Sequence, residues 1–167
     1  GTTMYSYLGI GLGKGTMRDL AQKVRKKKYL RDRWINLQIL IIDEISMLSA
    51  ELFDKLEQVA RIVRKNDKPF GGVQLILAGD FCQLPCIDSQ NFCFEAQSWK
   101  NTINHVIYLT EILRQSNPIF CKVLSKLRLG KKTGKVKKLI NSRIGANLIN
   151  SFGIMPTKLF SHNTYVD

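Results

Sequence analysis

LQILIIDE, residues 37–44, is the stretch of sequence that decides the fold. The aliphatic run Ile39 to Ile42 is followed at once by two carboxylates, Asp43 and Glu44. Such a short apolar run predicts a strand that is buried on both faces, as is typical of parallel sheets covered by helices. Open α/β sheets bind their ligands at the carboxyl ends of the strands. We therefore expect a functional site immediately after Ile42.

The two carboxylates have two interpretations. A buried strand that ends in Asp-Glu is the Walker B arrangement of P-loop ATPases, in which the Asp holds Mg²⁺, usually through water, and the Glu polarises the attacking water. On this interpretation Asp43 is the magnesium residue and Glu44 is the water-activating residue. The alternative is a strand that simply ends in acidic loop residues, because aliphatic runs followed by acidic residues are common.

A second apolar strand is predicted at residues 73–78, and it also runs directly into polar residues, GDFCQLP at 79–85. The carboxyl ends of adjacent parallel strands lie at the same edge of a sheet. If the two strands are neighbours, Asp43, Glu44 and Gln83 meet at that edge.

A third strand is expected at residues 106–109, and Arg114 follows it closely. The planar guanidinium fork of arginine binds phosphate oxygens well, so Arg114 is a candidate for stabilising the charge of a phosphoryl group. The alternative is an ordinary ion pair with Glu111, three residues away.

Three amphipathic helices are expected, each with a recognisable start. Thr16 and Ser49 can cap the first two helices, and the third begins at Pro118 and stops at Gly130. Their predicted inward-facing residues are Met17, Leu20, Ala21 and Val24 in the first, Leu52, Leu56, Val59, Ala60 and Val63 in the second, and Ile119, Phe120, Val123, Leu124 and Leu127 in the third. Helices that alternate with buried strands predict an α/β fold with a parallel sheet.

The charge balance predicts an anionic partner. With 26 basic and 13 acidic residues the net charge is +13, and nucleic acid is the partner that best fits such a balance. Basic residues gather at 25–33 and 131–143, where they contact phosphates or are merely solvated. The alternative is a soluble basic domain without such a partner. The four cysteines have no zinc-ligand spacing and are expected to be free thiols in a reducing compartment.

The opening stretch GTTMYSYLGIGLGKG, residues 1–15, is rich in glycine but contains no phosphate-loop pattern. It suits a loop that lets a nucleic-acid backbone come close, with hydroxyls from Thr3 and Ser6 and a stacking face from Tyr5 or Tyr7. The alternative is a surface loop whose aromatic residues are tucked into the core.

Taken together, these stretches resemble the Pif-type DNA helicases, in the RecD-like branch of helicase superfamily one. The matching pieces are GTTMYSYLGIGLG at 1–13, IIDEISML at 41–48, the segment 51–85 that ends in GDFCQLP, FCFEAQSWK at 92–100, LTEILRQ at 109–115 and LRLG at 127–130. The resemblance spans nearly the whole chain, and the segment 51–85 includes the stretch that marks this family among related helicases.

The resemblance implies a role for each candidate residue. Asp43 and Glu44 match the Mg²⁺-binding and water-activating pair, Gln83 matches a residue that senses the terminal phosphate, and Arg114 matches an arginine that contacts it. The opening loop matches a motif that touches single-stranded DNA. TKLFSHN at 157–163 looks like the beginning of a second RecA-like domain. The implied DNA-contacting residues are Thr3, Tyr5, Ser6, Lys158, His162 and Asn163.

The resemblance also implies a fold and an activity. The fold would be the P-loop NTPase, RecA-like parallel sheet with flanking helices. The activity would be that of an ATP-dependent 5′-to-3′ DNA helicase, with Mg²⁺ as cofactor. It would translocate on single-stranded DNA and unwind duplexes, forks and G-quadruplexes in DNA repair, recombination and telomere maintenance. We expect a monomer, located in the nucleus or mitochondrion if the organism is eukaryotic.

The sequence departs from the family pattern at three points. Tyr5 stands where the family usually has His, and Cys86 stands where it has a second Pro. The family's phosphate loop lies upstream of the opening loop, and it does not occur in this sequence. We therefore expect an N-terminally truncated fragment, with a partial first RecA-like domain at 1–150 and the start of a second at 151–167. Unpaired strand edges and exposed apolar surface should follow from this.

Two other functions stay open at this level. One is a non-catalytic nucleic-acid-binding remnant of such a helicase, which has kept the basic surface. The other is a different P-loop ATPase, such as a clamp loader, against which GDFCQLP and LTEILRQ argue. The pair Asp43 and Glu44 favours the helicase for the parent protein, because a pure binding module needs neither carboxylate.

Overall fold

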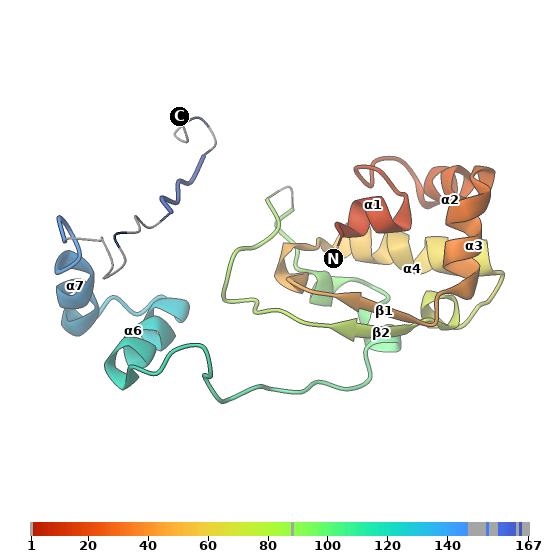
Figure 1. The fold of residues 1–167 in the computed structure, drawn as a ribbon. Helices are drawn as coiled ribbons and strands as arrows, with labels where there is room; N and C mark the ends of the chain where they lie inside the picture. Colours follow the sequence, from red (N-terminus) through yellow and green to blue (C-terminus); the bar gives the residue numbers. More distant parts are fainter. Residues whose placement is uncertain (1, 88, 147–152, 154–156, 163, 165–167) are drawn as a thin grey trace. The chain divides into compact units, whose positions relative to one another are not determined.

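The computed structural model describes residues 2–87, 89–146, 153, 157–162 and 164 (Figure 1). The chain divides into two compact units, Gly1–Thr110 and Glu111–Asp167. The elements of the first unit are α1 (Met4–Leu8), α2 (Met17–Lys26), α3 (Lys28–Asn36), β1 (Ile39–Ile42), η1 (Ile45–Met47), α4 (Ala50–Arg64), η2 (Pro69–Gly72), β2 (Gln74–Leu77), η3 (Cys93–Glu95) and α5 (Trp99–Thr102). The second unit contains α6 (Pro118–Arg128) and α7 (Gly134–Asn141). The predicted boundary between residues 150 and 151 lies outside the described residues and stays a prediction.

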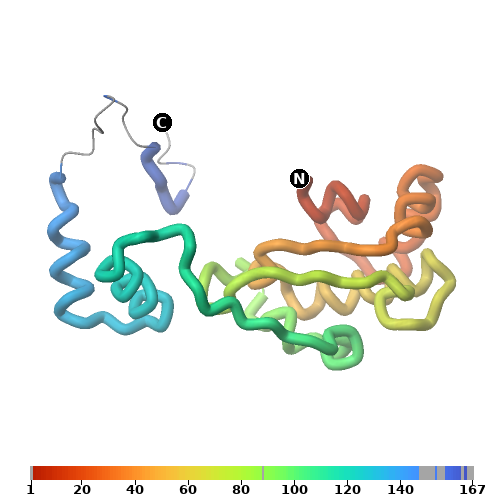
Figure 2. Tube along the Cα trace, turned by 60° about the horizontal axis from the view of Figure 1, so that its bottom comes forward, coloured from red at the N-terminus to blue at the C-terminus, as the bar shows by residue number. Residues whose placement is uncertain are grey.

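The sheet of the first unit is parallel, as predicted. β1 and β2 pair in register, from Ile39 with Gln74 to Ile42 with Leu77. The chain leaves β1, passes through α4 and returns to β2 in the same direction, which is the crossover that parallel strands need. Figures 1 and 2 both show the two strands running side by side. The predicted α/β class is confirmed.

Helices α2, α3 and α4 form the core together with one face of the sheet. Val24 of α2, Leu56 of α4 and Ile42 of β1 are all buried members of one apolar cluster. The predicted caps are present. The Thr16 hydroxyl accepts a hydrogen bond from the backbone N–H of Asp19 at 3.2 Å, and the Ser49 hydroxyl accepts one from Leu52 at 3.2 Å. Each cap satisfies a helix N–H that has no partner within the helix.

The prediction that the first strand is buried on both faces is wrong. Leu40 and Ile42 are buried, but Ile39 and Ile41 are 49% and 68% exposed. Successive side chains of a strand point to opposite faces of the sheet, and in the described residues the helices cover only one of them. The expected exposed apolar surface is therefore present, on the sheet face that carries Ile39, Ile41 and Ile76.

The prediction of a third strand at 106–109 is also wrong for this structure. The residues form no regular element, and Ile107 and Leu109 are 85% and 93% exposed. A strand exists only through hydrogen bonds to a neighbouring strand, and β1 and β2 pair only with one another in the described part of the chain. Apolar composition alone does not supply that neighbour.

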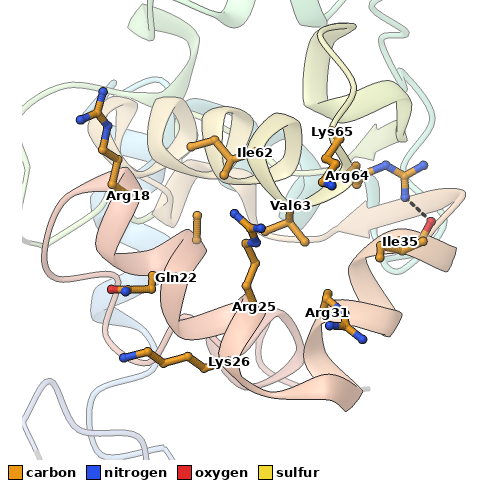
Figure 3. A pocket seen from close by; sticks show the side chains of 11 residues that line it. Arg18, Gln22, Arg25, Lys26, Arg31, Ile35, Ile62, Val63, Arg64 and Lys65 are labelled. Atoms are coloured by element: carbon orange, nitrogen blue, oxygen red, sulfur yellow. Dashed lines mark hydrogen bonds between the residues drawn. The ribbon is translucent and has the colours of Figure 1, made fainter.

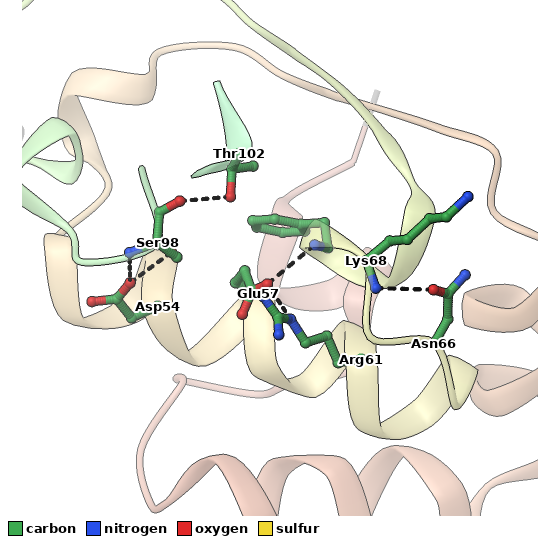
Figure 4. A network of polar contacts seen from close by, with 8 residues as sticks. Asp54, Glu57, Arg61, Asn66, Lys68, Ser98 and Thr102 are labelled. Carbon is green, nitrogen blue, oxygen red and sulfur yellow. Dashed lines mark hydrogen bonds and ion pairs between the residues drawn. The ribbon is translucent and has the colours of Figure 1, made fainter. Parts of the chain in front are cut away.

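Polar contacts hold the segments before and after β2 against α4 (Figure 4). The Asp54 carboxylate accepts hydrogen bonds from the backbone N–H of Ser98 at 2.9 Å and from its hydroxyl at 2.6 Å. The buried Glu57 accepts hydrogen bonds from Arg61 and from the backbone N–H of Phe70. These contacts satisfy carboxylates that would otherwise be costly to bury.

In the second unit, Asn117 caps α6 and Pro118 occupies its first turn, as the sequence predicts for the start of this helix. The predicted inward stripe is only partly correct. Val123 is buried, but Ile119 is 70% exposed and Leu127 is 39% exposed. The short helix α7 contributes the buried Val136 and is too small to cover the whole stripe. Within the described residues no helix has the length and apolar character needed to cross a membrane.

Candidate functional site

The carboxyl ends of β1 and β2 are joined by backbone hydrogen bonds. The N–H of Ala78 donates to the carbonyl of Ile42 at 2.9 Å, and the N–H of Ile45 donates to the carbonyl of Ala78 at 3.0 Å. A Cβ atom at Gly79 would lie 2.8 Å from the backbone nitrogen of Ile45, so this close approach requires glycine. The loops after the two strands therefore start from one fixed edge of the sheet, as the sequence predicts.

Asp43 and Glu44 lie at this edge, and both side chains are exposed. Glu44 adopts the left-handed conformation, with φ 53° and ψ 46°, and its backbone N–H donates to Oδ1 of Asp43 at 2.8 Å. Such a conformation is uncommon outside glycine and ends the strand abruptly. No ion pair in the described part of the chain neutralises either carboxylate. Exposed carboxylate oxygens are the donors that Mg²⁺ prefers, so Asp43 fits the predicted metal role.

Gln83 is held in a turn that follows β2. Its side-chain amide donates to Oδ2 of Asp80 at 3.2 Å, and its backbone N–H donates to the carbonyl of Asp80 at 2.9 Å. The other carboxylate oxygen of Asp80 accepts from the N–H of Cys82 at 3.0 Å. Asp80 thus orients the amide of Gln83 at the edge where Asp43 and Glu44 lie. We did not predict this role, although an Asp that bonds the backbone two residues further on is a recognised turn signal.

Three aromatic rings and a buried thiol lie behind this turn. Phe81 packs edge-on against Phe92 and Phe94, with ring centroids 5.8 Å and 4.8 Å apart, and the latter two rings stack at 5.2 Å. The Cys93 thiol donates to the carbonyl of Ile45 at 3.4 Å. Burial raises the pKa of Cys93 to about 11. Phe81 and Cys93 therefore tie the Gln83 turn and the residue after Glu44 to the same apolar support, which the sequence did not reveal.

The opening stretch contains a helix instead of the expected loop. Thr3 caps α1, because its hydroxyl accepts a hydrogen bond from the N–H of Ser6 at 3.3 Å. Tyr5 is 39% exposed. Tyr7 is half-buried beneath Arg33, whose guanidinium lies 4.8 Å from the ring centroid. Thr3, Tyr5 and Ser6 therefore lie on one helical turn. Tyr7, the other candidate for stacking on a base, already has the guanidinium of Arg33 against its ring.

The remaining predicted residues belong to the second unit. Arg114 is exposed and lies in the irregular segment before α6, and no ion pair joins it to Glu111 in the described residues. Lys158 and His162 are exposed, and the Ser161 hydroxyl lies 3.0 Å from Nδ1 of His162. Asn163 lies outside the described residues. A meeting of Arg114 with the edge at Asp43 therefore stays a prediction.

A protein-family model described as PIF1-like helicase matches residues 1–138. The chain belongs to the PIF1-like helicase family. The resemblance to Pif-type helicases, predicted from the motifs at 41–48 and 79–85, is confirmed.

Relatives of this PIF1-like chain are much longer than the chain itself. The ATP-dependent DNA helicase PIF1 of Emericella nidulans is 46% identical over 136 residues, which cover 78% of this chain and 18% of the relative. The ATP-dependent DNA helicase RRM3 of Saccharomyces cerevisiae is 41% identical over 173 residues, with coverages of 100% and 24%. For the human ATP-dependent DNA helicase PIF1 the identity is 39% over 166 residues, with coverages of 97% and 26%. The chain thus spans between 18% and 26% of these curated relatives.

Solved structures of Pif1 helicases share the fold. The crystal structure of Pif1 helicase from Candida albicans has a TM-score of 0.93 and 38% identity, and the match covers 98% of this chain and 38% of that one. The Pif1 helicase from Bacteroides, in complex with ADP-AlF3 and single-stranded DNA, has a TM-score of 0.72 and 29% identity, with coverages of 90% and 37%. The predicted RecA-like parallel fold is confirmed.

Proposed function

We propose that this chain is part of an ATP-dependent DNA helicase that moves 5′ to 3′ along single-stranded DNA. The observation that carries the proposal is the edge of the sheet, where Asp43, Glu44 and the Gln83 turn follow two parallel strands locked in register. Membership of the PIF1-like helicase family supports this reading, as do relatives named ATP-dependent DNA helicases.

In the proposed mechanism the residues at the edge act on the terminal phosphate of ATP. Glu44 accepts a proton from the water that attacks the γ-phosphorus, the bond to the bridging oxygen breaks, and ADP and phosphate leave. The side-chain amide of Gln83, which hydrogen-bonds to Asp80 in this structure, contacts the γ-phosphate and loses that contact when the phosphate leaves. Asp80 therefore acts as a positioning residue for Gln83.

The proposed cofactor is Mg²⁺, which would be held by Asp43 through water. When bound with ATP, this ion neutralises the charge that develops on the β- and γ-phosphate oxygens. The exposed carboxylate of Asp43, which is free of any lysine or arginine partner in the described residues, supports this assignment.

The second unit would supply Arg114 to the same phosphate. Its guanidinium is exposed and makes no ion pair in the described residues, so it is available for an anionic ligand. Arginine fits phosphate oxygens through two parallel N–H donors. Arg114 would then complete the set of catalytic residues with Asp43, Glu44 and Gln83.

The proposed DNA contacts lie at both ends of the chain. Thr3, Tyr5 and Ser6 present one helical turn, on which the exposed ring of Tyr5 offers a stacking face. Lys158, His162 and Asn163 are proposed for the other end. Beyond single-stranded DNA, we propose forked and G-quadruplex DNA as substrates, roles in DNA repair, recombination and telomere maintenance, and a monomeric state.

The test is DNA-stimulated ATP hydrolysis, measured on this chain and on any longer protein that contains it, each beside its Glu44→Gln variant. We expect the longer protein to hydrolyse ATP and the variant to lose most of that rate, because the amide cannot accept the proton. A general base typically contributes about 10²- to 10⁴-fold. We expect the 167-residue chain alone to be silent, since its sequence holds no phosphate-loop pattern.

One control variant and two contrary outcomes make the result decisive. Asp67→Asn changes an exposed carboxylate in the loop after α4, at the opposite end of that helix from the edge, and should leave the rate unchanged. Equal rates for the longer protein and its Glu44→Gln variant would contradict the proposal. DNA binding without any turnover by the longer protein would instead identify the alternative, a non-catalytic nucleic-acid-binding remnant.

A further inference from the structure

A cavity of about 860 Å³ lies in the first unit, where α2, α3 and the end of α4 come together (Figure 3). It is far from the edge that carries Asp43. Arg64, which lines the cavity, donates a hydrogen bond to the carbonyl of Leu37 at 2.8 Å. Leu37 precedes the amino end of β1, whereas Asp43 follows its carboxyl end. At about 3.3 Å per residue the two edges are separated by roughly 20 Å.

The cavity has an apolar floor and a cationic rim. Ala21 and Val63 are buried and form part of the floor. The cations that line it are Arg18, Arg25, Lys26, Arg31, Arg64 and Lys65, and no acidic side chain lines it. Figure 3 shows the side chain of Arg25 reaching from α2 into the space in front of Val63. Like charges gathered around one cavity repel each other unless an anion joins them.

Structural roles account for some of these cations. Arg64 donates to the carbonyls of Trp34, Ile35 and Leu37, so it satisfies the end of α3. Arg31 lies 3.4 Å from Asp32. Arg18, Arg25 and Lys65 make no ion pair in the part of the chain that the structure describes.

The helix dipole accounts for two of these three cations but not for Arg18. Arg25 and Lys65 lie at helix C-termini, where a cation is favoured. Arg18 is the second residue of α2, where the partial positive charge of the helix N-terminus disfavours a cation. A phosphate between Arg18, Arg25 and Lys65 would offset this cost, because guanidinium groups bind phosphate oxygens in pairs.

We propose that this cavity binds the phosphate backbone of a second segment of DNA, at the edge of the sheet opposite to the proposed ATP site. The proposal rests on the proposed function only in taking DNA as the partner. A protein that unwinds DNA holds more than one strand, and a second cationic site would retain a strand that has left the first. An acidic peptide is the competing ligand for the same charge.

The test is the salt dependence of DNA binding by the 167-residue chain. The triple variant Arg18→Gln, Arg25→Gln, Lys65→Gln leaves the structural Arg64 in place. The matched control Lys68→Gln, Lys100→Gln, Lys122→Gln removes the same charge from exposed lysines that do not line the cavity. Both are titrated with a single-stranded oligonucleotide long enough to span both edges, and circular dichroism checks that both remain folded.

Each phosphate contact contributes about 0.7 to the slope of log K against log salt for single strands. We expect the cavity variant to lower the slope by about 2 and the control to leave it unchanged. Equal loss in both variants, or loss in neither, would overturn the proposal. The proposal would also be overturned if the cavity substitutions weakened the binding of poly-glutamate but not the binding of DNA. If the longer protein does not hydrolyse ATP but the cavity variant still lowers the salt slope, only the proposed function is refuted. If the chain binds no DNA at all, both proposals are refuted.

Discussion

At the scale of single residues, the support behind the candidate site is as informative as the site itself. Cys93 is fully buried, and its thiol donates to the carbonyl of Ile45 beside Glu44. Burial raises the pKa of this thiol from 9.0 to about 11. Between these values the unfolded chain has lost the proton and the folded chain retains it. Unfolding then releases a proton, so stability falls as the pH rises from 9 to 11.

This sign gives a measurable difference. We expect the free energy of unfolding to fall across that window by on the order of 2 kcal/mol more in the unchanged chain than in Cys93→Ala. Denaturant titrations at a series of pH values measure it, and the comparison cancels the lysines and tyrosines that both chains share. Cys82→Ala is the control, because Cys82 is exposed and its removal should change nothing. Parallel pH profiles for all three chains would contradict the prediction.

Gly71 is a second residue whose role follows from its surroundings. It has a φ of +60°, and an added Cβ atom would lie 2.7 Å from the carbonyl oxygen of Ala60 in α4. We expect Gly71→Ala to cost about 2–4 kcal/mol of stability, from backbone strain and the clash together. Gly11 has a similar φ of +63° but faces only the end of the Lys23 side chain. Gly11→Ala should lower the free energy of unfolding by about 1 kcal/mol. Equal losses for Gly71→Ala and Gly11→Ala, measured by denaturant unfolding, would exclude a clash between residue 71 and Ala60.

At the scale of elements, the sequence predicted what local chemistry determines. The caps at Thr16 and Ser49, the proline start of α6 and the positions of strands β1 and β2 follow from residues within one turn or one strand. Predictions that depend on a neighbouring element were less successful. The strand Ile39 to Ile42 was predicted to be buried on both faces, because an unbroken aliphatic run does not show that helices cover only one face. Residues 106–109 read as a strand for the same reason.

The uncovered sheet face predicts that the 167-residue chain, when studied alone, aggregates through this face, whereas the monomeric state is proposed for the longer helicase. Ile41 is 68% exposed at its centre, while its neighbour Ile42 is 7% exposed and faces the core. We expect Ile41→Lys to lower the fluorescence of a bound hydrophobic dye and to reduce light scattering, with a change in stability within about 1 kcal/mol. Ile42→Lys should unfold the unit, since it buries an unpaired charge. Unchanged dye binding in Ile41→Lys would show that the apolar surface lies elsewhere.

At the scale of the whole molecule, the candidate site was predictable only within the first unit. Asp43, Glu44 and Gln83 meet one edge because parallel strands in register leave no other arrangement. Asp80, Phe81 and Cys93 were missed, because their roles arise from contacts across the turn and with the residues after β1. Arg114 was named from its place after the expected third strand and from the motif LTEILRQ, and its approach to the phosphate depends on how the two units come together, which no local pattern encodes.

The junction between the units gives the last prediction. The division of the chain falls at Thr110 and Glu111, and the preceding residues form no regular element, with Tyr108 83% exposed and Leu109 93% exposed. Proteases cut exposed segments that lack hydrogen-bonded backbone before they cut folded elements. We expect brief chymotrypsin treatment of the chain to cleave after Tyr108 or Leu109, and mass spectrometry to find the first unit nearly whole. The buried Phe53 and Phe70 serve as internal controls, because cleavage there requires unfolding of α4 and its partners.

Resistance at Tyr108 would mean that residues 106–109 are paired after all, as the sequence first suggested. Loss of that resistance in Ile107→Pro, which removes a backbone donor and leaves the cleavage site at Tyr108 in place, would then establish that the pairing is that of a strand.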